Sequence, residues 1–165
     1  MKDLKMLKLI KKIAQKRDVD FLELYIIFLV DKVLGVDFDE SVKKLFKNLD
    51  KKEYELLKDF FEHIEIYTPD DIVSLIDDYD KAAHTLVMFF APFLPEDVLF
   101  SKDAQKIKKA LNIYPAPIKE VILKTFETLS MVKLLKDEDK KTVILEVLNT
   151  INLLAQLLKE MNAAK

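Results

Sequence analysis

The main pattern in this chain is a repeat of apolar side chains every three to four residues along nearly its whole length. Such spacing places the apolar side chains on one face of an α-helix. Short β-branched runs occur only inside this helical pattern, and no segment alternates as a strand would. The pattern therefore predicts an all-α protein in which residues 1–165 form one domain, a single compact bundle of seven to eight helices.

Capping residues and prolines divide the pattern into individual helices. Asp50 and Thr68 are predicted N-caps, Pro69 stands at the first position of a helix, and Gly35 is the predicted stop of the helix before it. Val19–Leu34 is apolar nearly all round, which predicts the central buried helix. The predicted helices are Lys2–Arg17, Val19–Leu34, Asp39–Leu49, Lys51–Tyr67, Pro69–Phe90, Lys102–Asn112, Pro117–Lys136 and Glu138–Asn162, with a short turn at Glu96–Phe100.

Composition limits the loops and the chemistry. One glycine is present, where average usage gives about ten, so we expect the loops to be built from Asp, Asn, Ser and Pro. The absence of cysteine excludes a disulfide framework, a cysteine–zinc site and a cysteine nucleophile. It fits a reducing compartment, so we expect a cytoplasmic protein. The lysine-rich and glutamate-rich, glycine-poor composition also fits a thermophilic source.

The apolar runs are short. The longest are Leu24–Val30 and Leu86–Pro92, far below the ~20 residues that span a bilayer. Residues 1–17 carry lysines throughout and have no separate apolar core, unlike a secretory signal. The sequence therefore predicts neither a membrane span nor a signal peptide. Because the mean hydropathy is slightly positive, we expect some of the apolar surface to lie in a subunit interface.

Charge is distributed unevenly. Residues 1–17 carry seven basic side chains and one acid, a net charge of +6, whereas residues 18–80 carry seven basic and eighteen acidic side chains, a net charge of −11. The basic segment is a candidate for binding nucleic acid or an anionic surface. Its single arginine and its lack of aromatic residues favour the alternative, in which its lysines face solvent or the acidic segment. The candidate contacts are Lys5, Lys8, Lys12 and Lys16, with Lys102, Lys106 and Lys109 as additions.

The best candidate for chemistry is the set Asp77, Asp80 and His84. Spacings of three and four residues place all three on one helical face, and carboxylates with an imidazole suit a metal ion or acid–base work. Three ligands on one helix do not complete a site, however, so a solvated acidic face is the alternative. A single glycine excludes a phosphate-binding glycine-rich loop. We therefore predict no cofactor and keep a metal-dependent enzyme only as an alternative function.

The C-terminal helix is the first candidate binding surface. Its apolar residues repeat like a heptad seam, and amides lie beside them. No residue from 147 to 158 is charged, and uncharged amides are less costly to bury than charges. A packed wall of the bundle is the alternative interpretation. The predicted interface residues are Val147, Asn149, Ile151, Asn152, Leu154, Gln156, Leu158 and Met161.

The second candidate surface is the apolar stretch around the prolines Pro92 and Pro95. Its interpretation is either core packing or a groove for a partner helix or apolar ligand. The groove candidates are Phe89, Phe90, Phe93 and Phe100. Together these features predict a non-enzymatic interaction module that binds a protein partner, with a homodimer as the expected form.

Overall fold

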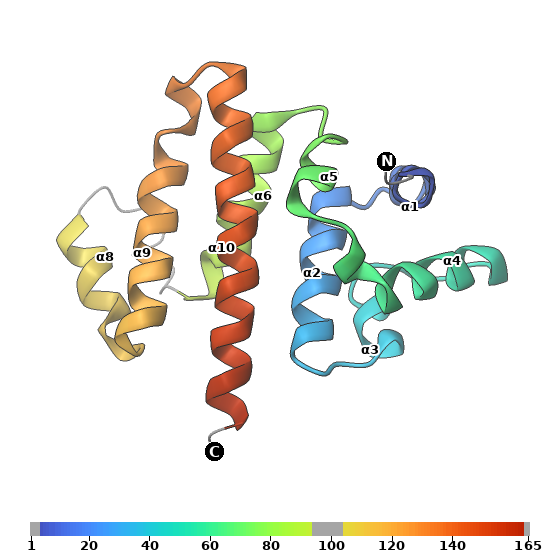
Figure 1. Ribbon diagram of the computed structural model, residues 1–165, viewed down its shortest axis with the longest axis horizontal. Coiled ribbons are helices and arrows are strands. Elements are labelled where there is room, and N and C mark those ends of the chain that lie inside the picture. The colour runs from blue at the N-terminus through green and yellow to red at the C-terminus, as the bar shows by residue number, and fades with distance from the viewer. Residues whose placement is uncertain (1–3, 94–103, 164–165) are drawn as a thin grey trace. The chain divides into compact units, whose positions relative to one another are not determined.

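In the computed structural model of the protein, which describes residues 4–93 and 104–163, every regular element is a helix (Figure 1). The all-α prediction is therefore confirmed. The predicted turn Glu96–Phe100 and the start of the helix predicted at Lys102 lie outside the described residues. With η for a 3-10 helix, the elements are α1 (Lys5–Lys16), α2 (Phe21–Val33), α3 (Phe38–Lys43), α4 (Lys51–Glu62), η1 (Ile64–Ile66), α5 (Pro69–Val73), α6 (Tyr79–Phe90), η2 (Ala91–Phe93), α8 (Ala104–Ala110), η3 (Leu111–Ile113), α9 (Ala116–Ser130), η4 (Val132–Leu134) and α10 (Asp137–Ala163).

The chain packs as two compact units. The first unit contains residues 1–76 and 151–165, and the second contains residues 77–150. One boundary, between Ile76 and Asp77, lies between α5 and α6, and the other lies within α10, so both units include part of that helix. The single-domain organisation expected from the chain length stays a prediction.

The first unit is built around α2, which packs against α1, α3 and α4. The ring of Phe28 on α2 is fully buried and contacts three other aromatic rings, with centroid distances of 5.9 Å to Phe38, 6.1 Å to Phe60 and 5.4 Å to Phe61. Such tilted and edge-to-face pairs add stability beyond the area that they bury. The prediction of a central helix is confirmed, because most of α2 is buried.

The helix starts of the first unit follow local side-chain chemistry. Asp50 accepts a hydrogen bond from the backbone N–H of Glu53 at 2.8 Å, and the Glu53 carboxylate accepts one from the backbone N–H of Asp50. Thr68 forms the same kind of capping box with Asp71, and Pro69 is the first residue of α5. Asp20 caps α2 through the backbone N–H of Glu23. These caps satisfy N–H groups that the helix leaves without partners.

Turns in this glycine-poor chain use other residues in the left-handed conformation. Gly35 has φ of +82° after the end of α2, as predicted for a helix stop. Asp18 and Asn48 also have positive φ, at 60° and 57°. Asp and Asn tolerate this region better than other residues with a side chain. The expectation that Asp and Asn replace glycine in the loops is confirmed at these two turns.

The second unit is built on α6, α9 and the first half of α10. The buried residues of α9 include Ile118, Ile122 and Leu129, spaced as one helical face. Phe90 of α6 is fully buried, and its ring lies 6.0 Å from that of Phe126 on α9. Lys140 near the start of α10 pairs with Asp80 on α6 at 3.0 Å. These contacts form a core whose residues follow the predicted 3.6-residue period.

The prediction of one helix from Pro69 to Phe90 is wrong. α5 ends at Val73, and α6 begins at Tyr79. Asp78 causes the new start, because its carboxylate accepts hydrogen bonds from the backbone N–H groups of Asp80 and Lys81. Asp side chains compete in this way with the helical hydrogen bonds of their own segment.

Candidate functional site

The helix α10 divides lengthwise into a buried line and an exposed edge. Its buried line consists of Ile144, Val147, Leu148, Ile151, Leu154 and Ala155. The opposite side carries four exposed uncharged residues, which we call the uncharged edge: Asn149, Asn152, Leu153 and Gln156. Leu153 exposes 52% of its surface. Spacings of three and four residues align this set along one side of the helix.

The eight predicted interface residues fall on different sides of α10. Val147, Ile151 and Leu154 are buried within the chain, so they are not accessible to a partner in this fold. The three amides are exposed, Leu158 is half-buried and Met161 is exposed near the helix end. Sequence reasoning missed Leu153, which lies on the line of the amides rather than on the heptad seam. The signal that could have identified Leu153 as an exposed residue is its position beside three uncharged polar residues.

The uncharged edge has the chemistry of a helix-pairing surface. Each amide side chain both donates and accepts hydrogen bonds, so it can pair with a second copy of itself. An interface with twofold symmetry presents the same patch from both subunits. Burying these amides requires no desolvation of a charge. Leu153 adds an apolar contact in the middle of the edge.

The predicted apolar groove is not assembled by the residues that the structure describes. Phe90 is fully buried and belongs to the core, where it contacts Phe89 at 5.1 Å between ring centroids. Phe89 is half-buried. Phe93 closes η2, but its side chain is outside the description, as is all of Phe100. Phe90 therefore belongs to the core, which is one of the two interpretations that the sequence pattern left open.

The predicted set Asp77, Asp80 and His84 does not converge on one point. Asp77 precedes α6, and Asp80 pairs with Lys140. His84 is exposed on α6. Over residues 4–93 and 104–163, no three His, Asp or Glu side chains lie close enough to hold a metal ion. The helix start at Asp78 separates Asp77 from the face that the other two share.

The basic helix α1 buries its apolar side and exposes lysines. Leu7, Ile10, Ile13 and Ala14 are buried, while Lys5, Lys8, Lys12 and Lys16 are exposed. Lys11 at the border of the two sides donates a hydrogen bond to the carbonyl oxygen of Leu75 at 2.7 Å. The further candidates Lys106 and Lys109 are exposed on α8 in the other unit, and Lys102 lies outside the described residues.

Three ion pairs that the sequence did not predict hold the first unit. The Arg17 guanidinium binds both carboxylate oxygens of the buried Glu53, including Nε to Oε2 at 3.1 Å. Lys44 contacts both oxygens of the buried Asp31 at 2.9 and 2.8 Å. Lys32 pairs with Glu65 at 2.7 Å. Each pair joins residues distant in the sequence, so no local spacing revealed it.

The pKa shifts follow from these structural contacts. The hydrogen bonds from Arg17, with that from the Asp50 backbone, lower the pKa of Glu53 from 4.5 to about 2. The hydrogen bond from Lys32 lowers the pKa of Glu65. Burial, with a smaller contribution from Asp71, raises the pKa of Tyr25 to about 12. Each shift is a property of a pair or of the core.

The Arg17–Glu53 pair predicts acid sensitivity. Because the pKa of Glu53 is lower in the folded chain than its ordinary value, the unfolded chain binds the proton more readily. The stability from this pair is complete above pH 4.5 and is lost as pH falls toward 2. We expect Glu53→Gln to be less stable than wild type at pH 7, with the gap narrowing toward pH 2.5. Urea unfolding at both pH values measures it, and an equal gap at the two would contradict the assignment.

Exposed apolar side chains also lie in the 3-10 turns that flank α9. Ile113 in η3, Leu134 in η4 and the adjacent Met131 are among the most exposed large apolar residues in the described chain. Leu134 belongs to a segment predicted as regular helix, and the 3-10 turn turns it outward. Single exposed apolar residues are common on folded proteins, so exposure alone does not indicate an interface at these positions.

One helix in the described part of the chain is long and apolar enough to cross a membrane. It is the segment Asp137–Met161 of α10, judged by length and composition. The sequence prediction of no span overlooked this segment, because scattered amides and threonines interrupt its apolar runs. The buried helix of a folded protein can have the same length and composition.

No family model matches this chain, and no match to it was found among the curated proteins or the solved structures. The class that the structure defines is an all-α protein of two compact helical units.

Proposed function

We propose that this protein is a non-enzymatic interaction module that self-associates as a homodimer through the uncharged edge of α10. The observation that carries the proposal is that Asn149, Asn152, Leu153 and Gln156 are exposed within a stretch without charge, residues 147–158. Charge is what normally keeps an exposed helix face soluble and monomeric. The exposed face of α4 is an example, since it alternates lysines with acids.

A second copy of the chain is the partner that best fits this edge. Amide side chains are self-complementary in hydrogen bonding, whereas a charged edge would repel its own copy. A single amide at such a helix pair can determine its register. Leu153 lies between the amides, so two copies related by a twofold axis bring two leucines into the same apolar contact.

The distribution of perturbed groups supports a non-enzymatic role. Shifted pKa values often mark reactive residues. Here Glu53 is bound by Arg17, Glu65 by Lys32 and the Tyr54 hydroxyl by Asp39. These pairs are contacts between side chains of the first unit that stabilise its fold. The cysteine-free sequence supports a cytoplasmic location for the module.

Size-exclusion chromatography with light scattering tests this proposal. We expect the wild-type chain to have about twice the monomer mass of 19.3 kDa. Leu153→Asp is expected to shift the mass to that of the monomer, because two like charges would face each other across the axis. A weakening of the dimer by about 100-fold, which corresponds to about 2.7 kcal/mol, is expected.

Leu134→Asp is the matched control, since it introduces the same charge at a leucine that exposes 84% of its surface in η4. This variant should remain dimeric. A monomeric wild type at all concentrations, or an unchanged mass for Leu153→Asp, would reject the proposal.

A further inference from the structure

The outer face of α1 carries the densest uninterrupted positive charge on a described helix of the first unit. Lys8, Lys12 and Lys16 are exposed and follow one another at four-residue spacing. At about 1.5 Å per residue, they form a row about 12 Å long on one side of the helix. Lys5 is exposed on the same face one turn earlier. We call Lys8, Lys12 and Lys16 the lysine row.

The lysine row is not neutralised by the fold. α1 contains no acidic residue. The ammonium groups of Lys8, Lys12 and Lys16 form no ion pair with the part of the chain that the structure describes. In contrast, the fold uses Lys11 and Arg17 internally, for Leu75 and Glu53. The positive charge of the exposed face is therefore available to an external anion.

The neighbouring helix α4 shows that this arrangement is not a general property of the surface. Its exposed lysines Lys51, Lys52 and Lys58 are interleaved with exposed acids, which give its outer face no net charge. The acids are Glu55, Asp59 and Glu62. Opposite charges at such spacing pair with one another along a helix. Of these two helices, only α1 carries charges of a single sign on its exposed face.

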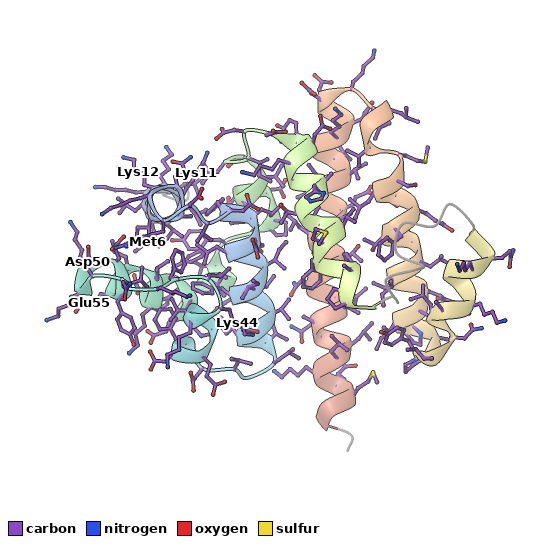
Figure 2. The ribbon with its side chains drawn as sticks, turned by 180° about the vertical axis from the view of Figure 1, so that it is seen from behind. Met6, Lys11, Lys12, Lys44, Asp50 and Glu55 are labelled. Carbon is purple, nitrogen blue, oxygen red and sulfur yellow. The ribbon has the colours of Figure 1, made fainter. Side chains whose placement is uncertain are left out.

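The geometry favours a grooved polyanion over a flat one. α1 packs against α4, and Figure 2 shows Lys11 and Lys12 on α1 with Asp50 and Glu55 at the nearby start of α4. A flat anionic membrane that contacted the row would also approach these acids and be repelled. The apolar face of α1 is buried in the core, so the helix cannot insert into lipid as a free amphipathic helix does.

A DNA duplex avoids both problems. Its major groove is about 12 Å wide and accepts a single helix, so a narrow ridge of lysines meets phosphates while the flanking acids stay away. We propose that the lysine row binds the phosphate backbone of double-stranded DNA. The row lacks arginine and aromatic side chains, so the contact is independent of base sequence. This inference goes beyond the proposed self-association and stands independently of it.

Fluorescence anisotropy with a labelled 20-base-pair duplex tests the inference. Neutralising about three phosphates predicts a slope of about −3 in log affinity against log salt. Affinity should therefore fall about 40-fold to 60-fold between 50 and 200 mM salt. The triple variant Lys8→Gln, Lys12→Gln, Lys16→Gln should bind at least about 10-fold more weakly at 50 mM salt, with most of the slope lost.

The control variant carries Lys51→Gln, Lys52→Gln and Lys58→Gln on α4, which removes the same net charge. It should keep most of the wild-type affinity and slope, and circular dichroism checks that both variants fold. The inference is overturned if the wild type does not bind the duplex at 50 mM salt, or if both triple variants lose affinity equally. Binding to vesicles with anionic phosphatidylserine in place of the duplex would also overturn it and indicate a membrane partner.

Discussion

Leu154→Asp is expected to prevent the chain from folding. Leu154 exposes only 1% of its surface. Loss of the buried leucine side chain costs about 2–5 kcal/mol, and a buried carboxylate without a partner adds several more. The sum is comparable with the whole stability of a typical domain, about 5–15 kcal/mol. Far-ultraviolet circular dichroism and urea unfolding of the purified variant measure the effect.

The adjacent leucine is the control for this prediction. Leu153→Asp changes a side chain that is half exposed, so we expect the variant to keep its helical spectrum and to lose at most about 1 kcal/mol of monomer stability. One variant thus tests the core and its neighbour tests the uncharged edge. A folded Leu154→Asp protein would mean that the buried line of α10 is not part of the core.

Phe28→Ala is expected to lower the free energy of unfolding by about 3–5 kcal/mol. Phe28 is fully buried and contacts Phe38, Phe60 and Phe61. Its removal leaves a cavity in the middle of the first unit and eliminates three ring contacts at once. Urea or thermal unfolding gives the loss, which for a chain of this size is a decrease of about 6–20 °C in Tm.

Two further substitutions are controls for the effect of Phe28→Ala. Phe28→Leu keeps most of the buried volume, so it should cost clearly less than Phe28→Ala. Leu34→Ala, at the exposed residue that follows α2, should change stability by less than about 1 kcal/mol. If Phe28→Ala costs no more than Leu34→Ala, the aromatic cluster does not form the core of the first unit.

Local features of the fold were predictable because their causes are local. Thr68, Pro69 and Asp71 lie within one turn, so their sequence order alone indicates a capping box. Gly35 indicates a helix end because glycine adopts a positive φ without steric cost. The exception is Asp78, where two adjacent aspartates and the following helix pattern gave no indication of which side chain would cap.

The candidate surfaces were predictable only in part, because periodicity identifies an apolar face but not what covers it. Val147, Ile151 and Leu154 have the spacing of a helix interface, and in the structure they are covered by their own chain. Leu153 is also a leucine and is adjacent to Leu154, but its side chain is exposed. Adjacent residues point about 100° apart around the helix axis. This angle separates a buried from an exposed side chain only after the other helices have packed against α10.

The sequence by itself determined the all-α class, most helix positions, their caps and the uneven charge, since these depend on residues within a few turns of one another. Only the tertiary structure decided which apolar line is core, which lysines remain exposed, and that Arg17 pairs with the buried Glu53. The Arg17–Glu53 and Lys11–Leu75 contacts join residues that are 36 and 64 positions apart, and no local pattern of spacing contains that information.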